Sequence, residues 1–386
     1  MSKTAENFDV LIVGGGVIGL SIAWELAQHD AKVCVVDRGS LGKEASWAGA
    51  GMIPPGPPPS HWSQATAYEQ LEGLSQSLQA QWHKKLLDLT GIDNEYRRCG
   101  SLQLALTDQK ADILQAKAAH WQSLGIECLP ADAALIADLE PALTGSAMQI
   151  RCGYVLPEEA QIRNPSHLQA LVAACESEGV VLKANTPITS LATENNRILS
   201  AATTDTKIHA DKFCLATGSW TGQLAKCLNI DLPVKPIRGQ IALLKGPAGL
   251  LQSNINVGPR YLVSRRDGHL LIGSTQEDVG FEKGTTDQSI EALRRLASTL
   301  APQTSSLPLQ TSWSGLRPST PDGLPLLGRL PEVKNGWIAA GHFRAGLQLS
   351  PATAVAMRAT IFEQTSPANI DSLSQARFAT ESACTS

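Results

Sequence analysis

The chain of 386 residues is 43% hydrophobic and 18% charged, and it carries a formal net charge of −4 at pH 7. Because a single hydrophobic core usually stops growing below this length, we expect two domains. The weak negative charge, without a long basic run, argues against a nucleic-acid or anionic-membrane partner. A small molecule is the expected partner.

The eight cysteines are scattered, with no Cys-x-x-Cys pair and no cysteine–histidine cluster at metal-ligand spacing. We therefore expect reduced thiols and no metal site. Residues 1–8 are polar and lack the pattern of a secretory signal, and no apolar stretch reaches the eighteen residues of a membrane span. These features lead us to expect a cytoplasmic protein.

The first predicted strand, residues 10–13, runs into a glycine-rich turn at residues 14–19. Gly14 permits a tight turn, Gly16 lets the backbone approach a phosphate, and Gly19 lets the following helix pack closely on the strand. The helix N-terminus adds unpaired N–H groups and a positive dipole. This pattern predicts a pyrophosphate site.

The helix after this turn is predicted to be amphipathic, with one apolar face formed by Ile18, Ile22 and Leu26. A second strand, residues 32–36, ends at Asp37, eighteen residues after Gly19. An acid at this spacing accepts hydrogen bonds from the ribose hydroxyls of a dinucleotide and repels a 2′-phosphate. The motif alone does not choose between FAD and a nicotinamide cofactor.

The middle of the chain is predicted to continue the nucleotide-binding unit. A helix at 165–178 is followed by a strand at 180–182, and residues 185–188 form a turn into another strand. The apolar run 212–216 predicts a buried strand whose end meets the cofactor.

Alternating apolar residues then predict antiparallel strands at 240–244, 261–264 and 270–273, with a hairpin turn at 266–268. A sheet of this kind can cover a cavity with alternate side chains. The last strand is expected at 337–340. A helix follows it, capped by Ser350 with Pro351 in its first turn, or beginning nearer Gly346.

These elements predict a discontinuous cofactor-binding domain and a second domain inserted into it. We assign residues 1–90, 150–225 and 312–370 to the first domain, and residues 91–149 and 226–311 to the second. Residues 371–386 are rich in small and polar side chains, so we expect a loosely held tail.

Ordered motifs in residues 10–52 and 233–351 resemble the D-amino acid oxidase superfamily of flavoproteins, and within it most closely the glycine oxidases linked to thiamine biosynthesis. The most specific motifs are Gly315-Leu316-Arg317-Pro318, Pro321-Asp322-Gly323-Leu324-Pro325 and Gly341-His342-Phe343-Arg344-Ala345-Gly346. Glu44 and Trp47 depart from the usual threonine- and alanine-rich run, and Ser264 stands where proline is common. Trp47 either narrows the substrate cavity or points into the core.

The resemblance implies an α/β fold. A Rossmann-like FAD-binding domain of the glutathione reductase type should carry a second, substrate domain built on an antiparallel sheet. The residues that the glycine motif and the resemblance assign to FAD are Gly14, Gly16, Val17, Ile18, Gly19, Asp37, Arg38, Ala45, Ser46, Ala50, Gly51, Met52, Ile188, His342, Phe343, Arg344, Ala345, Gly346, Leu347 and Gln348. The N-terminus of the last helix is expected to face the flavin, where reduction places negative charge.

Catalytic roles are predicted for three residues. Arg317 should bind the substrate carboxylate, because a guanidinium offers two parallel donors that lysine cannot copy, and Tyr261 should add a second donor. Arg344 binds the carboxylate directly or holds the loop against the flavin. In this superfamily the amine is thought to react neutral, so His342 is expected to be a flavin neighbour and not a base.

The sequence therefore predicts oxidation of glycine, sarcosine or a small D-amino acid with bound FAD, and oxygen as the electron acceptor. FAD should be non-covalent, because no cysteine lies between Cys227 and Cys384 and no histidine between His29 and His61. The main alternative is a dehydrogenase of the same fold that reduces a quinone or carrier. A nicotinamide enzyme and a non-catalytic binding protein are further alternatives, and a homo-oligomer is left open.

Overall fold

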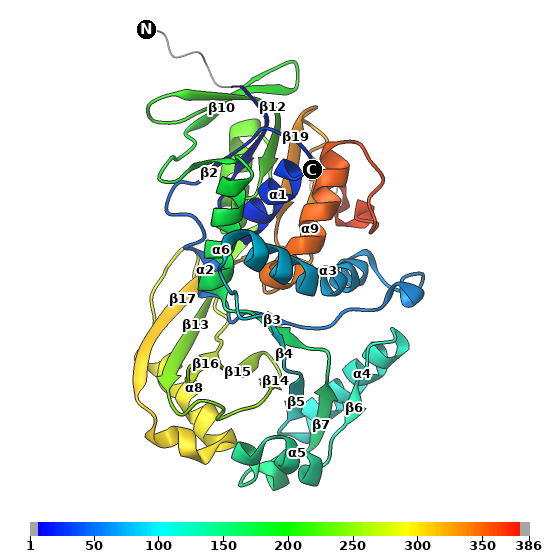
Figure 1. Cartoon of the computed structure of the whole chain (residues 1–386), viewed down its shortest axis with the longest axis vertical. Coiled ribbons are helices and arrows are strands. Elements are labelled where there is room, and N and C mark those ends of the chain that lie inside the picture. Colours follow the sequence, from blue (N-terminus) through cyan, green and yellow to red (C-terminus); the bar gives the residue numbers. More distant parts are fainter. Residues whose placement is uncertain (1–6, 379–386) are drawn as a thin grey trace, which may run out of the picture.

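The computed structural model describes residues 7–378, arranged on two eight-stranded sheets and a small third sheet. In Figure 1 the first sheet and its helices occupy the upper half, and the second sheet lies below them. The first sheet contains β10 (Ser190–Glu194), β11 (Arg197–Ala202), β12 (Lys207–Leu215), β1 (Asn7–Val13), β2 (Val33–Val36), β9 (Val181–Lys183), β19 (Gly336–Ala340) and β18 (Leu326–Arg329).

Five strands of this sheet, in the order β9-β2-β1-β12-β19, pair in parallel. Residues 10–13 of β1 and all four residues of β2 are continuous apolar runs because both faces of the sheet are covered there, and all of these residues are buried. The strands expected at 10–13, 32–36, 212–216 and 337–340 are confirmed, with their starts within five residues and their ends within one residue of the prediction. Their carboxyl ends meet at one edge, which is where open α/β sheets bind ligands.

The helices are α1 (Val17–Ala27), α2 (Ala45–Ala48), α3 (Ala67–Thr90), α4 (Asp108–Ser123), α5 (Ala133–Leu139), α6 (Asn164–Ser177), α7 (Thr221–Ala225), α8 (Asp287–Leu300) and α9 (Gly346–Ile361). The prediction that α1 is amphipathic was wrong, since all eleven of its residues are buried. Helices α6 and α9 flank it on the sheet (Figure 1). The polar Glu25 is accommodated because its carboxylate pairs with Arg358 of α9 at 3.0 Å.

Helix α9 begins at Gly346, so the alternative that placed Ser350 at its cap was wrong. Pro351 lies inside the helix and has no N–H to donate to the carbonyl of Leu347. That carbonyl accepts instead from the Ser350 hydroxyl and the Gln79 amide of α3, both at 3.2 Å. The helix continues through its proline because α3 supplies the missing donor.

The second sheet has the order β17-β13-β16-β15-β14-β5-β7-β6. Its strands are β17 (Leu309–Ser319), β13 (Lys235–Lys245), β16 (His269–Gly273), β15 (Arg260–Ser264), β14 (Asn254–Val257), β5 (Ser101–Ala105), β7 (Cys152–Leu156) and β6 (Leu129–Pro130). All neighbours pair antiparallel except β14 and β5, which are parallel. The hairpin expected at 266–268 joins β15 to β16.

The two faces of this sheet have different tasks because side chains alternate along each strand. One face packs on α8 and α5 through residues such as Leu262 and Ile272, which form a separate apolar core. The opposite face carries Ile241 and Tyr261 and turns toward the first sheet. The substrate cavity described below lies on this second face.

A third, three-stranded sheet joins β3 (Met52–Ile53), β8 (Ala160–Gln161) and β4 (Arg97–Arg98). Strands β7 and β17 pair in the second sheet, whereas the boundaries predicted at residues 150 and 312 assign both strands to the cofactor-binding domain. We retain the two-domain division as a proposal, with these two strands moved to the second domain.

The predicted loose tail is only partly covered by the structure, because residues 379–386 lie outside the described residues. The preceding segment is not loose. Ile370 and Leu373 are buried, and Arg377 forms an ion pair with Asp322 at 2.8 Å. Within residues 7–378, no helix has the length and apolar character needed to cross a membrane.

Replacing Gln79 by methionine should lower the free energy of unfolding by roughly 1 kcal/mol or more, because buried carbonyls of α9 lose a donor. Urea denaturation at saturating FAD measures this change. Gln81→Met, on an exposed position of the same helix, is the matched control and should stay close to the wild-type stability. Equal effects of the two substitutions would contradict the role of Gln79.

Candidate active site

A cavity of about 400 Å³ opens at the carboxyl edge of the parallel strands, around the glycine turn. Two glycines there leave no room for a side chain. A Cβ on Gly14 would lie 2.3 Å from the carbonyl oxygen of Ala216, and one on Gly19 would lie 1.9 Å from that of Gly14. The backbone of β1, β12 and α1 is therefore in direct contact, as the close packing of a dinucleotide site requires.

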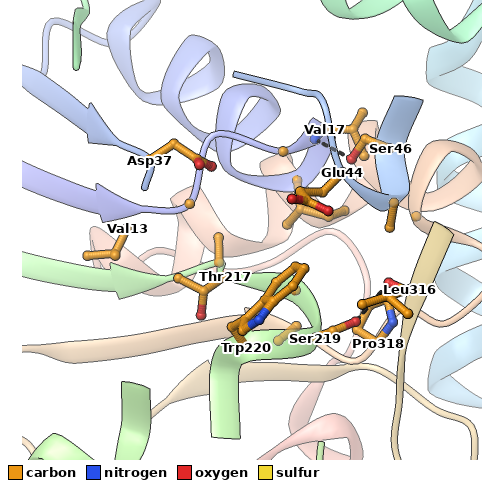
Figure 2. Close-up of a pocket in the computed structure, with 18 of the residues that line it drawn as sticks. Val13, Val17, Asp37, Glu44, Ser46, Thr217, Ser219, Trp220, Leu316 and Pro318 are labelled. Atoms are coloured by element: carbon orange, nitrogen blue, oxygen red, sulfur yellow. Dashed lines mark hydrogen bonds between the residues drawn. The ribbon is translucent and has the colours of Figure 1, made fainter. Parts of the chain in front are cut away.

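The start of α1 offers an anion site. Its cap residue is Gly16, which has no side chain to occupy the free N–H groups, and its first turn has no acidic residue. Ser46 accepts a hydrogen bond from the N–H of Val17 at 2.9 Å, so the loop 44–51 is tied to this helix end (Figure 2). A pyrophosphate fits this cradle.

Asp37 lies on the wall of this cavity at the end of β2 (Figure 2). One of its oxygens accepts from the N–H of Gly15 at 2.7 Å, and the other from the N–H of Gly39 at 2.8 Å. The carboxylate thus orders the glycine turn, and it remains on the cavity surface where a ribose hydroxyl could reach it.

Most predicted cofactor residues gather around two adjoining cavities. Those that line the first are Gly14, Gly16, Val17, Ile18, Asp37, Arg38, Ala45, Ser46, Ile188, His342, Phe343, Arg344, Gly346 and Leu347. Those that line a second cavity, of about 340 Å³, are Ala45, Ala50, Gly51, Met52, Arg344, Ala345, Leu347 and Gln348. Gly19 lines neither, and its place is set by packing against Gly14.

His342 is 3% exposed, and its Nε2 lies 3.1 Å from the Thr353 hydroxyl of α9. Burial lowers the pKa of His342 to about 3. A histidine held neutral in this way is a poor proton acceptor at neutral pH, which argues against a general-base role. Its hydrogen bond ties the end of β19 to α9, whose uncapped N-terminus borders both cavities.

Arg317 lies where the two cavities meet. Its guanidinium rests on the backbone of Gly239 in the neighbouring strand, where a Cβ would lie 2.0 Å from Nη2. Nη2 donates to the Ser274 hydroxyl at 2.6 Å, and Nη1 donates to the Thr275 carbonyl at 3.2 Å. Burial lowers the pKa of Arg317, although the interaction with Tyr261 opposes this fall.

No acidic side chain within residues 7–378 forms a salt bridge with Arg317. A half-buried cation that has only neutral hydrogen-bond partners in the protein is stabilised when an anion binds it. The arrangement can therefore hold a small carboxylate in the second cavity.

Tyr261 is 4% exposed, and its ring covers Gly273, where a Cβ would lie 2.4 Å from the hydroxyl oxygen. Tyr261 and Arg317 both line the second cavity, and the Tyr261 hydroxyl interacts with the Arg317 guanidinium. Arg344 is exposed, borders both cavities, and donates to the carbonyl of Pro259 at 2.7 Å. This bond joins the loop before α9 to the turn before β15 and leaves both predicted roles of Arg344 open.

The structure shows where two residues that depart from the family pattern, Trp47 and Glu44, are located. Trp47 packs against Trp313 with ring centres 5.4 Å apart and does not line either cavity, so it does not narrow the substrate cavity. Glu44 lines the first cavity and pairs with Lys283 at 2.7 Å, which ties the loop 276–286 of the second sheet to the cofactor side.

Sequence reasoning missed several lining residues. Trp220 lines the first cavity with the Arg38 guanidinium 3.7 Å from its ring centre, and its place just after the predicted strand end could have indicated it (Figure 2). The missed residues of the second cavity include Tyr68, Glu72, Gln103, Lys117, Glu159 and Asn256. They come from segments without a motif, so no local signal marked them.

The comparisons with known proteins agree with this geometry. Residues 9–360 match the family described as "FAD dependent oxidoreductase" (DAO). The chain belongs to this family. The glycine cradle, the uncapped α1 and the first cavity, which the glycine turn and Asp37 both line, fit the FAD that gives the family its name.

Its relatives are similar over most of the chain. It is 36% identical to a glycine oxidase of Pseudomonas aeruginosa, over 89% of this chain and 92% of the relative. It is 35% identical to the bifunctional protein ThiO/ThiG of a Nostoc species, over 93% of this chain and 53% of that protein. The crystal structure of glycine oxidase from Geobacillus kaustophilus superposes with a TM-score of 0.89 at 29% identity, covering 96% of this chain and 99% of that one.

Gly19→Ala should weaken FAD binding by more than about tenfold, because the added methyl group would collide with the Gly14 carbonyl and push α1 away from the cradle. Quenching of tryptophan fluorescence during titration of the apoprotein with FAD measures this. Gly39→Ala is the control, since a Cβ there meets nothing closer than 3.9 Å. Unchanged affinity in Gly19→Ala would refute the packing argument.

Acid should destabilise the fold partly through His342. The folded protein keeps this ring neutral down to about pH 3, whereas the unfolded chain binds a proton below about pH 6.5. Its contribution is therefore complete above pH 6.5 and declines toward pH 3, by up to about 1.4 kcal/mol per pH unit. Urea unfolding between pH 6.5 and 4.5 should show a shallower pH slope in His342→Gln, with exposed His29→Gln as control.

Proposed function

We propose that this chain oxidises the amine carbon of glycine, sarcosine or a small D-amino acid, and that oxygen then accepts the electrons and yields hydrogen peroxide. The observation that carries the proposal is Arg317, a half-buried guanidinium with only neutral hydrogen-bond partners in the protein, at the junction of the two cavities. The similarity to glycine oxidases supports the choice of substrate.

The side chains act by binding and orienting the substrate. Arg317 offers its fork to the carboxylate, and Tyr261 donates from the other side, so the acid group is fixed at one end of the cavity. The substrate's α-carbon is thereby directed toward the cavity junction, and a fixed orientation lowers the entropic part of the barrier. Bound FAD would supply the two-electron acceptor for the hydride on that carbon.

Two groups prepare the site for the charge that develops. The uncapped N-terminus of α9 directs its dipole and free N–H groups at the junction, where they stabilise negative charge. His342 stays neutral beside it and holds α9 through Thr353. We propose, as the family resemblance implies, that the neutral amine is the reacting form.

We further propose that the FAD is non-covalent and that Asp37 binds its ribose. The ThiO half of the Nostoc relative supports a role in thiamine biosynthesis. We also propose that the protein assembles into a homo-oligomer, because homo-oligomers are common in the family that it resembles.

A peroxide assay with glycine, sarcosine, D-alanine and D-proline tests the activity, and dye reduction under nitrogen separates an oxidase from a dehydrogenase. We expect peroxide at a rate similar to substrate consumption. Flavin that is reduced by these substrates but is reoxidised slowly by oxygen would favour the dehydrogenase. No flavin reduction by any of them would reject amine oxidation.

Arg317→Lys should raise the KM for glycine by roughly 30- to 100-fold, because an ammonium cannot bind a carboxylate with two parallel hydrogen bonds. Steady-state kinetics measures the change, and the flavin absorbance of the purified variant shows that the cofactor site is intact. Arg329→Lys, an exposed arginine paired with Glu363, serves as control. A KM that rises equally in both variants would exclude Arg317 as the anchor.

A further inference from the structure

The second cavity extends far beyond the space that glycine needs. Tyr261 of β15 lies opposite Asn256 of β14, and Asn256 lies opposite Gln103 of β5, so all three side chains stand on one face of the sheet. At about 4.8 Å per strand, the backbone of Gln103 lies roughly 10 Å beyond that of Tyr261. We name Gln103, Asn256 and Glu159 the distal wall, because they line the cavity on the side away from Arg317.

Glu159 is the buried centre of this wall, only 1% exposed, in the turn before β8. Its carboxylate accepts from the Ser101 hydroxyl at 2.7 Å and from the amide groups of Asn254 at 3.0 Å, Gln103 at 3.3 Å and Asn256 at 3.4 Å. Burial raises the pKa of Glu159, and the hydrogen bonds from these neighbours oppose the rise. Within residues 7–378, Glu159 forms no salt bridge.

Glu159 decides which way the two amides of the distal wall point. Because Gln103 and Asn256 both give their NH₂ groups to its carboxylate, their carbonyl oxygens turn away from it. Neither carbonyl oxygen accepts a hydrogen bond from a described residue. Neither is among the fully buried polar atoms that have no partner, so both are accessible from the cavity. Two acceptors, backed by a buried carboxyl group, are therefore open to the cavity.

The charges around the distal wall favour a cation. Glu72 of α3 faces the same cavity, and Lys117 of α4 stands at its side with the ammonium 4.5 Å from the Trp121 ring centre. Lys117 is an exposed residue on a surface helix, so it can leave when another cation enters.

We propose that the distal wall is a subsite for a second ammonium group, so that the cavity also takes amino acids whose side chain ends in an amine. The carboxylate would lie on Arg317, and the distal ammonium would donate to the carbonyl oxygens of Gln103 and Asn256. This inference rests on the anchoring role proposed for Arg317. It adds a preference for substrates with a distal ammonium group, which activity on glycine does not reveal because glycine is too short to reach the distal wall.

Three carboxylates that cannot be oxidised at an α-amine test the subsite in the FAD-loaded protein: 6-aminohexanoate, hexanoate and adipate. Each has an acid group for Arg317, and the far ends carry an ammonium, a methyl group and a second carboxylate. Perturbation of the flavin absorbance gives each Kd. We expect 6-aminohexanoate to bind about tenfold more tightly than hexanoate, and adipate more weakly than hexanoate.

Two variants assign the preference to the distal wall. Gln103→Met keeps the side-chain length but removes the acceptor, and it should bring the Kd ratio of hexanoate to 6-aminohexanoate close to one. Gln109→Met, exposed on α4, is its matched control and should keep the wild-type ratio. Lys117→Gln, which removes the competing cation from an exposed position, should tighten 6-aminohexanoate severalfold and weaken adipate.

Equal Kd values for hexanoate and 6-aminohexanoate in the wild type, or a ratio that survives Gln103→Met, would overturn the subsite. Tighter binding of adipate than of hexanoate would overturn the choice of a cation. These outcomes do not depend on turnover. If glycine does not reduce the bound flavin, the proposed function is rejected. The Kd values of the three carboxylates would still show whether the distal wall binds an ammonium group.

Discussion

The partial burial of one guanidinium without a protein carboxylate is the constraint on which the candidate active site depends. Removing part of the hydration shell of an unpaired charge is unfavourable, and neutral acceptors such as the Ser274 hydroxyl offset only part of this cost. The fold tolerates Arg317 because the strands beneath it are held elsewhere, by the apolar core on the opposite face of the sheet. A carboxylate that enters the cavity supplies the ion pair that Arg317 lacks in the folded chain. The free energy of folding is therefore less favourable than it would be with a protein carboxylate at this place, and the difference is available for substrate binding.

Glycines make this arrangement sterically possible. Gly239 of β13 and Gly315 of β17 lie opposite each other. Gly239 lies beneath the guanidinium of Arg317, and Gly315 lies against Ala48 of α2. Gly273 leaves the space that the Tyr261 ring fills. A larger residue at any of these positions would occupy the space of the Arg317, Tyr261 or Ala48 side chain and would change this face of the cavity. Because the opposite face carries the hydrophobic core, this sheet can hold a cavity on one side without losing its strands.

The sequence predicted the parts of the molecule that local patterns encode. The glycine turn, the parallel strands and the hairpin between β15 and β16 each have a periodic or turn signal within a few residues. The failures involve partners far away in the chain. The complete burial of α1 depends on α6 and α9, the helix through Pro351 depends on Gln79, and the membership of β7 and β17 depends on distant strands. The distal wall had no motif because its residues meet only in the folded sheet.

Helix α3 connects the two cavities mechanically. Its Gln79 and Ser75 bind the carbonyls of the first turn of α9, the turn whose N-terminus borders both cavities. One to three turns earlier, the same helix places Tyr68 and Glu72 on the wall of the second cavity, and Glu72 accepts from the Gln348 amide at 3.2 Å. A displacement of α3 must therefore move the α9 dipole and the cavity wall together, because α3 is a single rigid element. The charge-stabilising end of α9 and part of the wall of the substrate cavity are consequently positioned by one helix, although α9 lies far from α3 in the sequence.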